Sequence, residues 1–343
     1  MSAGTTAVAE PEVEPRCAER PAREASRRGA VLTVVGPTAV GKTGVAIAVA
    51  RTLGGEIVSA DSRQVYRGMD IGTAKPTREE QAQVRHHLID IVEPCERYDA
   101  ARFAADAEAA ISRLLREGVT PIVVGGTGFY LASLFEGLFE APPRDESVRA
   151  ELERRLADVG PEALHEELER ADPRAAARIH RRDGGRVVRA LELFRTTART
   201  LSEWHAGPRR VPAYEPLYVV LTMARLPLRE RIGRRVDAMM RAGFPREVAS
   251  LRAAGRLLPG MPAASAVGYR ELLELGERGG DALAEAVERI KTSTRRYAKR
   301  QLTWFRSLPT ARWLDAGELG AEATAAEIVR LARAGNALTG GEP

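Results

Sequence analysis

The clearest chemical signal in the chain is a glycine-rich segment that can hold phosphate groups. It fits the pattern GxxxxGK(S/T) and consists of Gly36, Pro37, Thr38, Ala39, Val40, Gly41, Lys42 and Thr43. An apolar run precedes it and a helical stretch follows, so its backbone N–H groups would converge on the oxygens of a nucleotide or a diphosphate. Lys42 would reach the terminal phosphates, and the Thr43 hydroxyl would bind Mg²⁺. Phosphate binding is therefore predicted, while the reaction stays open because many enzymes share this loop.

Two further polar residues follow other predicted strands and could act on a substrate beside the phosphates. Asp61 comes after the run at residues 56–59, which places it at the carboxyl end of a parallel strand. Its carboxylate could hold Mg²⁺ through water or accept a proton from an acceptor substrate, or it could only cap a helix. Thr127 belongs to a second glycine-rich turn, residues 125–130, and would point its hydroxyl into the same cleft.

These residues need a parallel sheet to bring them together, and the pattern of the chain predicts one. Apolar, largely β-branched runs occur at residues 30–35, 56–59, 88–92, 121–124 and 219–221. Helical stretches at 43–53 and 100–117 lie between them, and the second repeats apolar residues at helical spacing. Strands that alternate with helices are typical of an α/β fold with a mostly parallel sheet flanked by helices.

The alternation stops after residue 143. From residue 145 to about 205 there is no strand candidate, and helical segments rich in Arg, Glu, Ala and Leu are broken at Gly160, Asp172 and Asp183. We therefore predict an all-helical lobe at residues 144–212, inserted into an α/β core of residues 29–143 and 213–320. Residues 1–28 mix charged residues, Ala and Pro without an apolar stripe, and they are predicted to be a disordered tail.

Composition excludes several classes of protein. The 343 residues are 44% hydrophobic and 29% charged, which is enough for a substantial core and excludes a disordered or fibrous chain. Lys and Arg number 52 and Asp and Glu 47, so the net charge of +5 permits a polyanionic partner without requiring one. Two cysteines, Cys17 and Cys95, form no disulfide framework or thiolate zinc motif. No apolar run is long enough to span a membrane and no secretory signal is evident, so we expect a cytoplasmic protein.

Five sequence segments together resemble one protein family. GPTAVGKT, DSRQVYRGMDIGTAKPT, HHLIDI, GGTGFY and VGYRE occur in this order and resemble the bacterial tRNA dimethylallyltransferases, also called tRNA isopentenyltransferases. The resemblance covers residues from about 30 to about 315. It implies a monomeric P-loop NTPase-like enzyme that uses Mg²⁺ and binds dimethylallyl diphosphate. The acceptor would be the exocyclic N6 amine of the adenosine immediately 3′ of the anticodon, in a subset of tRNAs.

The resemblance also implies roles for individual residues. Mg²⁺, Lys42 and the loop amides would stabilise the departing diphosphate, which is the larger electrostatic task. Asp61 would accept the amine proton, and Thr127 would orient the adenine. Arg225 would be a further diphosphate ligand, although on sequence grounds alone it is as well explained as a salt-bridge residue.

Contacts with the anticodon stem-loop are implied in five places. The residues are Asp61, Ser62, Arg63, Gln64, Thr127, Arg149, Gly185, Arg186, Val187, Val188, Arg189, Ser265, Ala266, Val267, Gly268, Tyr269 and Arg270. Arg186 and Arg189 could equally form a solvated helix face, because their spacing puts them on one side without deciding its partner. Ser265 departs from the family pattern, since relatives often carry a longer polar residue there.

The stretch at residues 291–306 interleaves basic and aromatic side chains. Such a pattern suits an RNA backbone and also suits an ordinary amphipathic helix, and the resemblance favours RNA. His86 and His87 are adjacent on a predicted strand and would point to opposite faces, so we interpret them as structural.

Two other functions remain possible from the residues alone. A P-loop small-molecule kinase would bind ATP in the phosphate loop, use Asp61 as its base and ignore tRNA. A non-catalytic RNA-binding protein that uses a nucleotide as a switch would bind tRNA tightly and leave it unchanged. The segment from Asp61 to Thr77 and the two glycine-rich turns favour the transferase.

Overall fold

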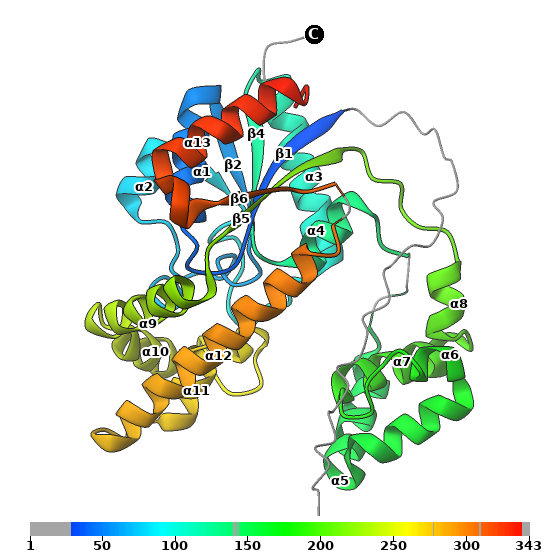
Figure 1. The fold of residues 1–343 in the computed structure, drawn as a ribbon. Coiled ribbons are helices and arrows are strands. Elements are labelled where there is room, and N and C mark those ends of the chain that lie inside the picture. Colours follow the sequence, from blue (N-terminus) through cyan, green and yellow to red (C-terminus); the bar gives the residue numbers. More distant parts are fainter. Residues whose placement is uncertain (1–28, 140–141, 143, 277, 309, 338–343) are drawn as a thin grey trace, which may run out of the picture. The chain divides into compact units, whose positions relative to one another are not determined.

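The computed structural model describes residues 29–139, 142, 144–276, 278–308 and 310–337. These residues form two compact units (Figure 1). Of the described residues, the core unit combines those up to Phe135 with those from Ala213 onwards, and the helical unit comprises those from Glu136 to Pro212. The tail predicted at residues 1–28 lies outside the described residues.

The core unit is built on one parallel six-stranded sheet with the strand order β3-β2-β4-β1-β5-β6. The strands are β1 (Ala30–Val35), β2 (Gly55–Ala60), β3 (His86–His87), β4 (Thr120–Gly125), β5 (Glu215–Thr222) and β6 (Arg312–Asp315). All residues of β4 and five of the six in β1 are buried, which explains why these strands consist of continuous apolar runs rather than alternating ones. The predicted α/β class with a parallel sheet flanked by helices is confirmed.

Helices cover both faces of the sheet (Figure 1). On one face α1 (Lys42–Leu53) packs beside α13 (Ala316–Ala334), and both share an apolar cluster with alternate residues of the central strands. On the other face α3 (Ala100–Arg116) packs against β2, β4 and α4 (Gly128–Phe135). The Asp99 side chain accepts from two backbone N–H groups in the first turn of α3, which defines where that helix begins.

A further group of helices follows β5 and lies beyond the carboxyl ends of the strands (Figure 1). It contains α9 (Arg225–Arg241), α10 (Phe244–Ala253), the 3₁₀ helix η1 (Pro262–Ser265), α11 (Tyr269–Leu275) and α12 (Asp281–Phe305). The long helix α12 contacts α9, α11 and α4, so it connects this group to the sheet. The short helix α2 (Arg78–Gln83) starts with a complete capping box at Thr77 and Glu80.

The helical unit contains α5 (Glu146–Ala171), α6 (Pro173–Ala176), α7 (Gly184–Thr197) and α8 (Leu201–Ala206). Leu152, Leu168 and Leu191 are fully buried in its own apolar cluster. Gly160 has φ 82° and kinks α5 where Pro161 follows. The chain entering the unit pairs with the chain leaving it through an antiparallel bridge between Phe139 and Arg209, so the unit begins at Glu136 rather than at residue 144.

Two sequence-based expectations differ from the structure. The strand expected at residues 88–92 is wrong: Leu88 and Asp90 have φ values of 62° and 55°, which a strand cannot accommodate, and the strand is His86–His87 instead. The core end expected at residue 320 falls inside α13, which packs on α1 beyond that position. Both misjudgements involve short or amphipathic segments whose pairing partners lie far away in the sequence.

Candidate active site at the carboxyl edge of the sheet

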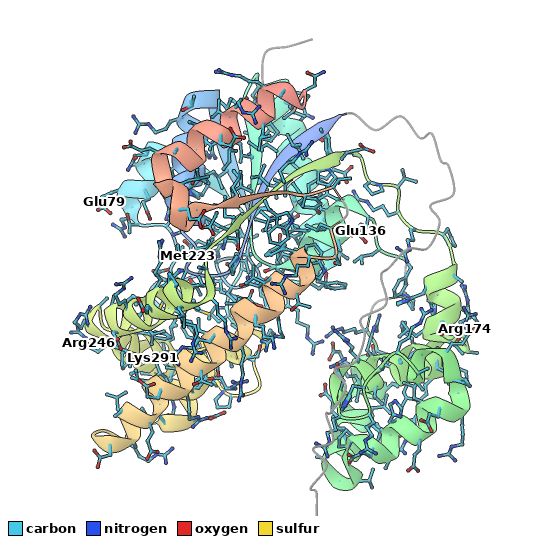
Figure 2. All side chains as sticks on the ribbon, viewed as in Figure 1. Glu79, Glu136, Arg174, Met223, Arg246 and Lys291 are labelled. Carbon is cyan, nitrogen blue, oxygen red and sulfur yellow. The ribbon has the colours of Figure 1, made fainter. Side chains whose placement is uncertain are left out.

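Strand register brings three chain segments to one edge. Val35 and Ala60 both lie opposite Gly125, so β1, β2 and β4 end at the same level. The phosphate loop (residues 36–43), Asp61 and the second turn (residues 125–130) therefore leave neighbouring strand ends. Figure 2 shows the side chains between these strand ends and the C-terminal helices, with Met223 just after β5 and Lys291 on α12.

The phosphate loop depends on two glycines for different reasons. A Cβ on Gly36 would lie 2.6 Å from the backbone oxygen of Leu221, so the close approach of β5 excludes a side chain. Gly41 has φ 105° and precedes α1, where the first helical N–H groups have no partner within the helix. Lys42 Nζ donates to the carbonyl oxygens of Gly36 and Pro37, both at 2.9 Å, which holds its ammonium inside the loop. The loop thus presents amides and a cation together.

Electrostatics at Lys42 favour an anion. Burial lowers the pKa of Lys42 to about 8, against the opposing effect of the Asp61 carboxylate, and Arg235 lowers it further. Burial also lowers the pKa of Arg235, which lies near both Asp61 and Arg231. A Cβ on Gly41 would be 3.4 Å from the guanidinium of Arg231. Three buried or half-buried cations therefore surround the loop, and a diphosphate would offset their charge.

The sequence analysis proposed Arg225 as a diphosphate ligand and did not single out Arg231 or Arg235. Arg225 is the first residue of α9 and is exposed, and no described contact joins it to the phosphate loop. Arg231 and Arg235 lie one helical turn apart on α9. This helix begins three residues after the end of β5. Two arginines at i, i+4 on a helix that starts at the catalytic edge of the sheet are the signal that could have identified them.

Asp61 is oriented by its own turn. Its Oδ1 accepts from the backbone N–H groups of Arg63 at 2.8 Å and Gln64 at 3.4 Å. The Ser62 N–H donates to Thr127 Oγ1 at 3.1 Å, and the Thr127 N–H donates to the Ala60 carbonyl at 3.3 Å. These bonds tie the two turns together and leave Asp61 Oδ2 without a hydrogen bond to another described residue.

Helix α12 forms a third side of the site; the sequence predicted this basic and aromatic stretch as an RNA contact and did not predict its contacts with the two turns. Tyr297 lies near Thr127 and Asp61, and burial, followed by the Asp61 carboxylate, raises the pKa of Tyr297 to about 12. Gln301 contacts both glycine-rich turns. A Cβ added to Gly128 would lie 2.3 Å from the Trp304 ring, so this ring packs directly on the backbone of the second turn. The spacing i, i+4, i+7 on one face of a basic helix was the available signal.

The loop after Asp61 is held by the C-terminal helices. Glu247 on α10 accepts from the backbone N–H groups of Asp70, Ile71 and Gly72 at 3.0, 2.7 and 3.2 Å. The same carboxylate accepts from the Tyr269 hydroxyl at 2.6 Å. One carboxylate thus joins the loop to α11.

Other residues predicted to contact RNA are brought to the same area. Arg63 Nη1 donates to the Pro262 carbonyl at 3.4 Å, so the segment from Asp61 to Gln64 adjoins η1. The other predicted segment here is residues 265–270. In it Ser265 and Arg270 are exposed, Val267 is half-buried, and Ala266, Gly268 and Tyr269 are buried. Arg270 is paired with the buried carboxylate of Glu271 at 2.8 Å. Residues 265–270 therefore have exposed side chains at both ends and buried or half-buried residues between them.

The arginines predicted in the helical unit differ in their environments. Arg149 and Arg189 form ion pairs at 3.3 and 2.7 Å with Glu192, whose side chain is only 1% exposed. The Arg186 side chain is 74% exposed and pairs with Asp183 at 3.4 Å. Gly185 lies in the first turn of α7, and Val187 and Val188 are buried in the unit's apolar cluster. Arg186 is the predicted arginine here that is open to a partner.

The donor atoms present fit Mg²⁺. Among the described residues no three His, Cys, Asp or Glu side chains gather into a metal-binding group. Mg²⁺ needs no such cage, because it is usually held by one or two carboxylates, substrate phosphates and water. The Thr43 hydroxyl, which has no hydrogen-bond partner among the described residues, and the Asp61 carboxylate supply hard oxygen donors at the phosphate loop.

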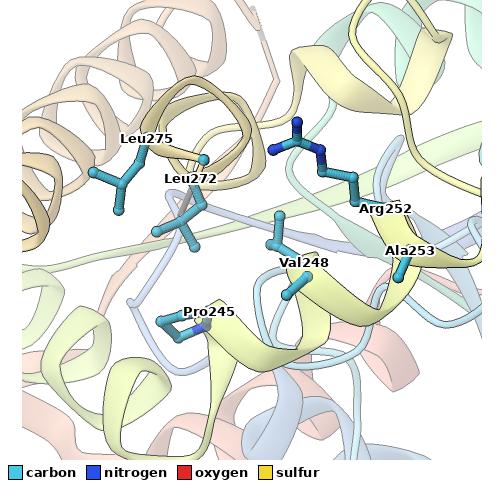
Figure 3. A pocket seen from close by; sticks show the side chains of 8 residues that line it. Pro245, Val248, Arg252, Ala253, Leu272 and Leu275 are labelled. Carbon is cyan, nitrogen blue, oxygen red and sulfur yellow. The ribbon is translucent and has the colours of Figure 1, made fainter. Parts of the chain in front are cut away.

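A separate hollow lies between α10 and α11 (Figure 3). Its volume is about 310 Å³, and it is lined by Pro245, Val248, Ala249, Arg252, Ala253, Leu272, Leu275 and Gly276. Arg252 is its only ionisable side chain, so the lining offers no acid–base pair.

No helix in the described parts of the chain is long and apolar enough to cross a membrane.

Fold and site together define the class of protein. A phosphate loop follows the central strand of a parallel sheet, and a carboxylate and a hydroxyl leave the next strand ends, as expected for a P-loop NTPase-like enzyme that acts on a phosphate ester. The model of the IPP transferase family matches residues 64–308, and that of the isopentenyl transferase family matches residues 29–95.

Individual relatives agree with these matches. The chain is 45% identical over 300 residues to the tRNA dimethylallyltransferase of Geobacillus kaustophilus, covering 87% of this chain and 94% of the relative. It is 48% identical over 297 residues to that of Thermomicrobium roseum, covering 86% and 89%. The crystal structure of the tRNA isopentenylpyrophosphate transferase from Bacillus halodurans superimposes with a TM-score of 0.65 at 39% identity, covering 89% of this chain and 96% of that one. A eukaryotic dimethylallyltransferase that acts on tRNA gives 0.73 at 28% identity, covering 92% and 81%.

The chain belongs to the tRNA dimethylallyltransferase family. The resemblance described from the sequence is thereby confirmed, and the kinase and nucleotide-switch alternatives are not supported.

Proposed function

We infer that this protein transfers a dimethylallyl group from dimethylallyl diphosphate to the N6 amine of the adenosine 3′ of the anticodon in tRNA, releasing diphosphate. The observation that carries this function is the common strand level of Val35, Ala60 and Gly125. It puts a diphosphate-binding loop next to a carboxylate that can take a proton from an acceptor. Membership of the family supplies the class of substrates.

The residues support a direct displacement. The N6 lone pair forms a bond to the allylic carbon, and the bond from that carbon to the diphosphate oxygen breaks. We assign stabilisation of the leaving diphosphate to Lys42, Arg231, Arg235 and the loop amides, because these cations gather at the phosphate loop. Asp61 accepts the proton released from the amine, and Thr127 orients the adenine.

Mg²⁺ fits beside Thr43 and Asp61, where a bound ion would neutralise part of the diphosphate charge. The remaining charge falls to the protein, and Lys42 is positioned for it by its two carbonyl contacts. We propose Mg²⁺ as the cofactor because hard oxygen donors surround the loop.

The adenosine must leave the stacked anticodon loop to reach Asp61. We assign RNA contact to the exposed residues among those predicted, which include Ser265 and Arg270, and to Arg186 in the helical unit. Phe129 is 63% exposed two residues after Thr127 and suits stacking on an unpaired base. Buried members such as Tyr269 act by holding the contacting loops in place. Arg225 remains a proposed diphosphate ligand.

The decisive experiment combines purified protein, unmodified tRNA and dimethylallyl diphosphate, followed by mass analysis of the nucleosides. We expect one dimethylallyl group on the adenosine 3′ of the anticodon and an equal amount of released diphosphate. Unchanged tRNA, together with turnover of ATP on a small molecule, would refute the assignment. Because the acceptor is tRNA, we also propose a cytoplasmic enzyme, and a monomer, which light scattering of the purified protein checks.

A further inference from the structure

One buried side chain joins the two halves of the proposed site. Gln301 on α12 is 6% exposed. Its Oε1 accepts from the Thr38 N–H of the phosphate loop at 2.9 Å, and its Nε2 donates to the carbonyl oxygen of Gly126 in the second turn at 2.8 Å. The side that holds the leaving group and the side that holds the acceptor are therefore connected through one carboxamide.

The local sequence shows that this contact is built into the site. A Cβ on Gly126 would lie 2.2 Å from Gln301 Nε2, although the backbone of Gly126 is not left-handed. Gly126 is therefore required by the approach of the carboxamide and not by the conformation of the turn. A carboxamide is the one neutral side-chain group that both donates and accepts in the plane of one short fork, so neither Glu nor Met can reproduce both bonds.

Displacement requires the amine and the allylic carbon to approach within about 3.5 Å, and an error of about 1 Å in placement costs roughly 10²-fold in rate. The diphosphate binds to the phosphate loop, whereas the adenine is oriented by Thr127, the residue after Gly126. We propose that Gln301 is a positioning residue, which sets the spacing between the diphosphate and the acceptor amine. This inference rests on the proposed function.

A positioning role makes a specific prediction for single-turnover kinetics. With enzyme in excess over radiolabelled tRNA and with saturating dimethylallyl diphosphate, the rate constant reports placement, and the melting temperature measured in parallel reports folding. Gln301→Met keeps the length of the side chain and removes both bonds. We expect its rate constant to fall by roughly 10 to 10²-fold, while tRNA affinity stays within about twofold of wild type.

Two further variants test the same bond from other sides. Gln301→Glu keeps the bond from Thr38 and places a carboxylate against the Gly126 carbonyl, and Gly126→Ala displaces the carboxamide without altering α12. Both should lower the rate constant. Thr303→Val is the matched control, because its exposed hydroxyl bonds only to Lys299 on the same helix, and it should behave as wild type.

The results separate three cases. A wild-type rate constant in Gln301→Met, with or without a lower melting temperature, would overturn the proposal and leave Gln301 a structural residue. If Gln301→Met does not fold, the rate constants of Gln301→Glu and Gly126→Ala decide by the same criterion. Failure of the wild-type protein to modify tRNA would instead refute the proposed function.

Discussion

At the residue scale the site combines Lys42, a cation that burial removes from water, with Asp61, a carboxylate held in place by backbone hydrogen bonds. Lys42 is buried among the carbonyl oxygens of its own loop, and its pKa is lowered to about 8. Asp61 uses one oxygen for its turn, and the other has no hydrogen bond to a described residue and could accept a proton. Each residue therefore supports a test based on its own ionisation.

Diphosphate affinity should depend on pH through Lys42. A bound diphosphate raises the pKa of Lys42 above its value in the free protein, so the affinity is fully present below pH about 8 and is lost as pH rises through that value. The loss should approach about tenfold per pH unit above it. Calorimetric titration with diphosphate across this range measures the effect. Lys42→Arg, which stays charged, is the control, and a flat wild-type profile would refute the lowered pKa.

Asp61→Asn should separate proton transfer from loop structure. The amide oxygen can still accept from the N–H groups of Arg63 and Gln64, whereas the charge and basicity are lost. We expect the single-turnover rate to fall by roughly 10²–10⁴, with tRNA affinity nearly unchanged. Filter binding and rapid quench measure the two quantities. Equal losses of rate and affinity would make Asp61 a recognition residue.

At the element scale the C-terminal helices α10 and α12 hold in place the loops that follow the strands of the sheet. Helix α12 directs Tyr297 and Gln301 at the second turn, and α10 holds the loop after Asp61 through Glu247. A Cβ on Gly72 would lie 2.1 Å from the Phe244 ring, so this loop packs closely against α10. Loop positions thus depend on helices that lie more than a hundred residues later.

Glu247→Gln tests that dependence. A single amide oxygen replaces a carboxylate that accepts from three backbone N–H groups and the Tyr269 hydroxyl, so at least one donor loses its partner. We expect a loss of about 1–3 kcal/mol in the free energy of unfolding, together with weaker tRNA binding and unchanged diphosphate affinity. Urea unfolding and filter binding measure these effects. The exposed Glu285 provides the control variant, Glu285→Gln, and equal behaviour of the two would contradict the role.

At the scale of the whole molecule the chain leaves the core after α4 and returns at β5. Because β5 pairs with β1 on the side opposite β4, the sheet is completed only after the helical unit has been passed. α13 then covers α1 from the C-terminal end of the chain. The helical unit has a separate apolar cluster, so charge changes on its surface should leave the sheet intact.

Arg186 and Arg189 should behave differently, although they lie on the same helix. Arg186→Ala removes an exposed charge, so tRNA affinity should fall and its salt slope should decrease by about 1. Arg189→Ala removes one of the two arginines paired with the buried Glu192, which keeps Arg149 and the Asp145 N–H, and should mainly lower stability. A salt series of tRNA binding and thermal unfolding separate the effects. The exposed Arg182 gives the control variant Arg182→Ala, and a wild-type slope for Arg186→Ala would remove its assigned RNA contact.

Local patterns were sufficient for the fold class and for the meeting of the proposed site residues at one edge. The positions of the phosphate loop, Asp61 and Thr127 could be predicted because each directly follows a strand, and parallel strands end at the same edge of a sheet. The helical unit could be predicted because its breaks coincide with Gly160, Asp172 and Asp183, whose backbone preferences are local. None of these predictions needed to know which distant residue packs against which.

Only the tertiary structure identified Gln301, the arginine pair of α9 and the ion pairs of Glu192. Thr38 and Gln301 are separated by 263 positions, and helical periodicity tells which residues share a face but not which neighbour that face meets. The same limit applies to Arg189. Its environment depends on the carboxylate of Glu192, three residues later, which is buried by the packing of the helical unit. Strand ends are set by the local chain, whereas the partners of a side chain are set by how the helices pack on the sheet.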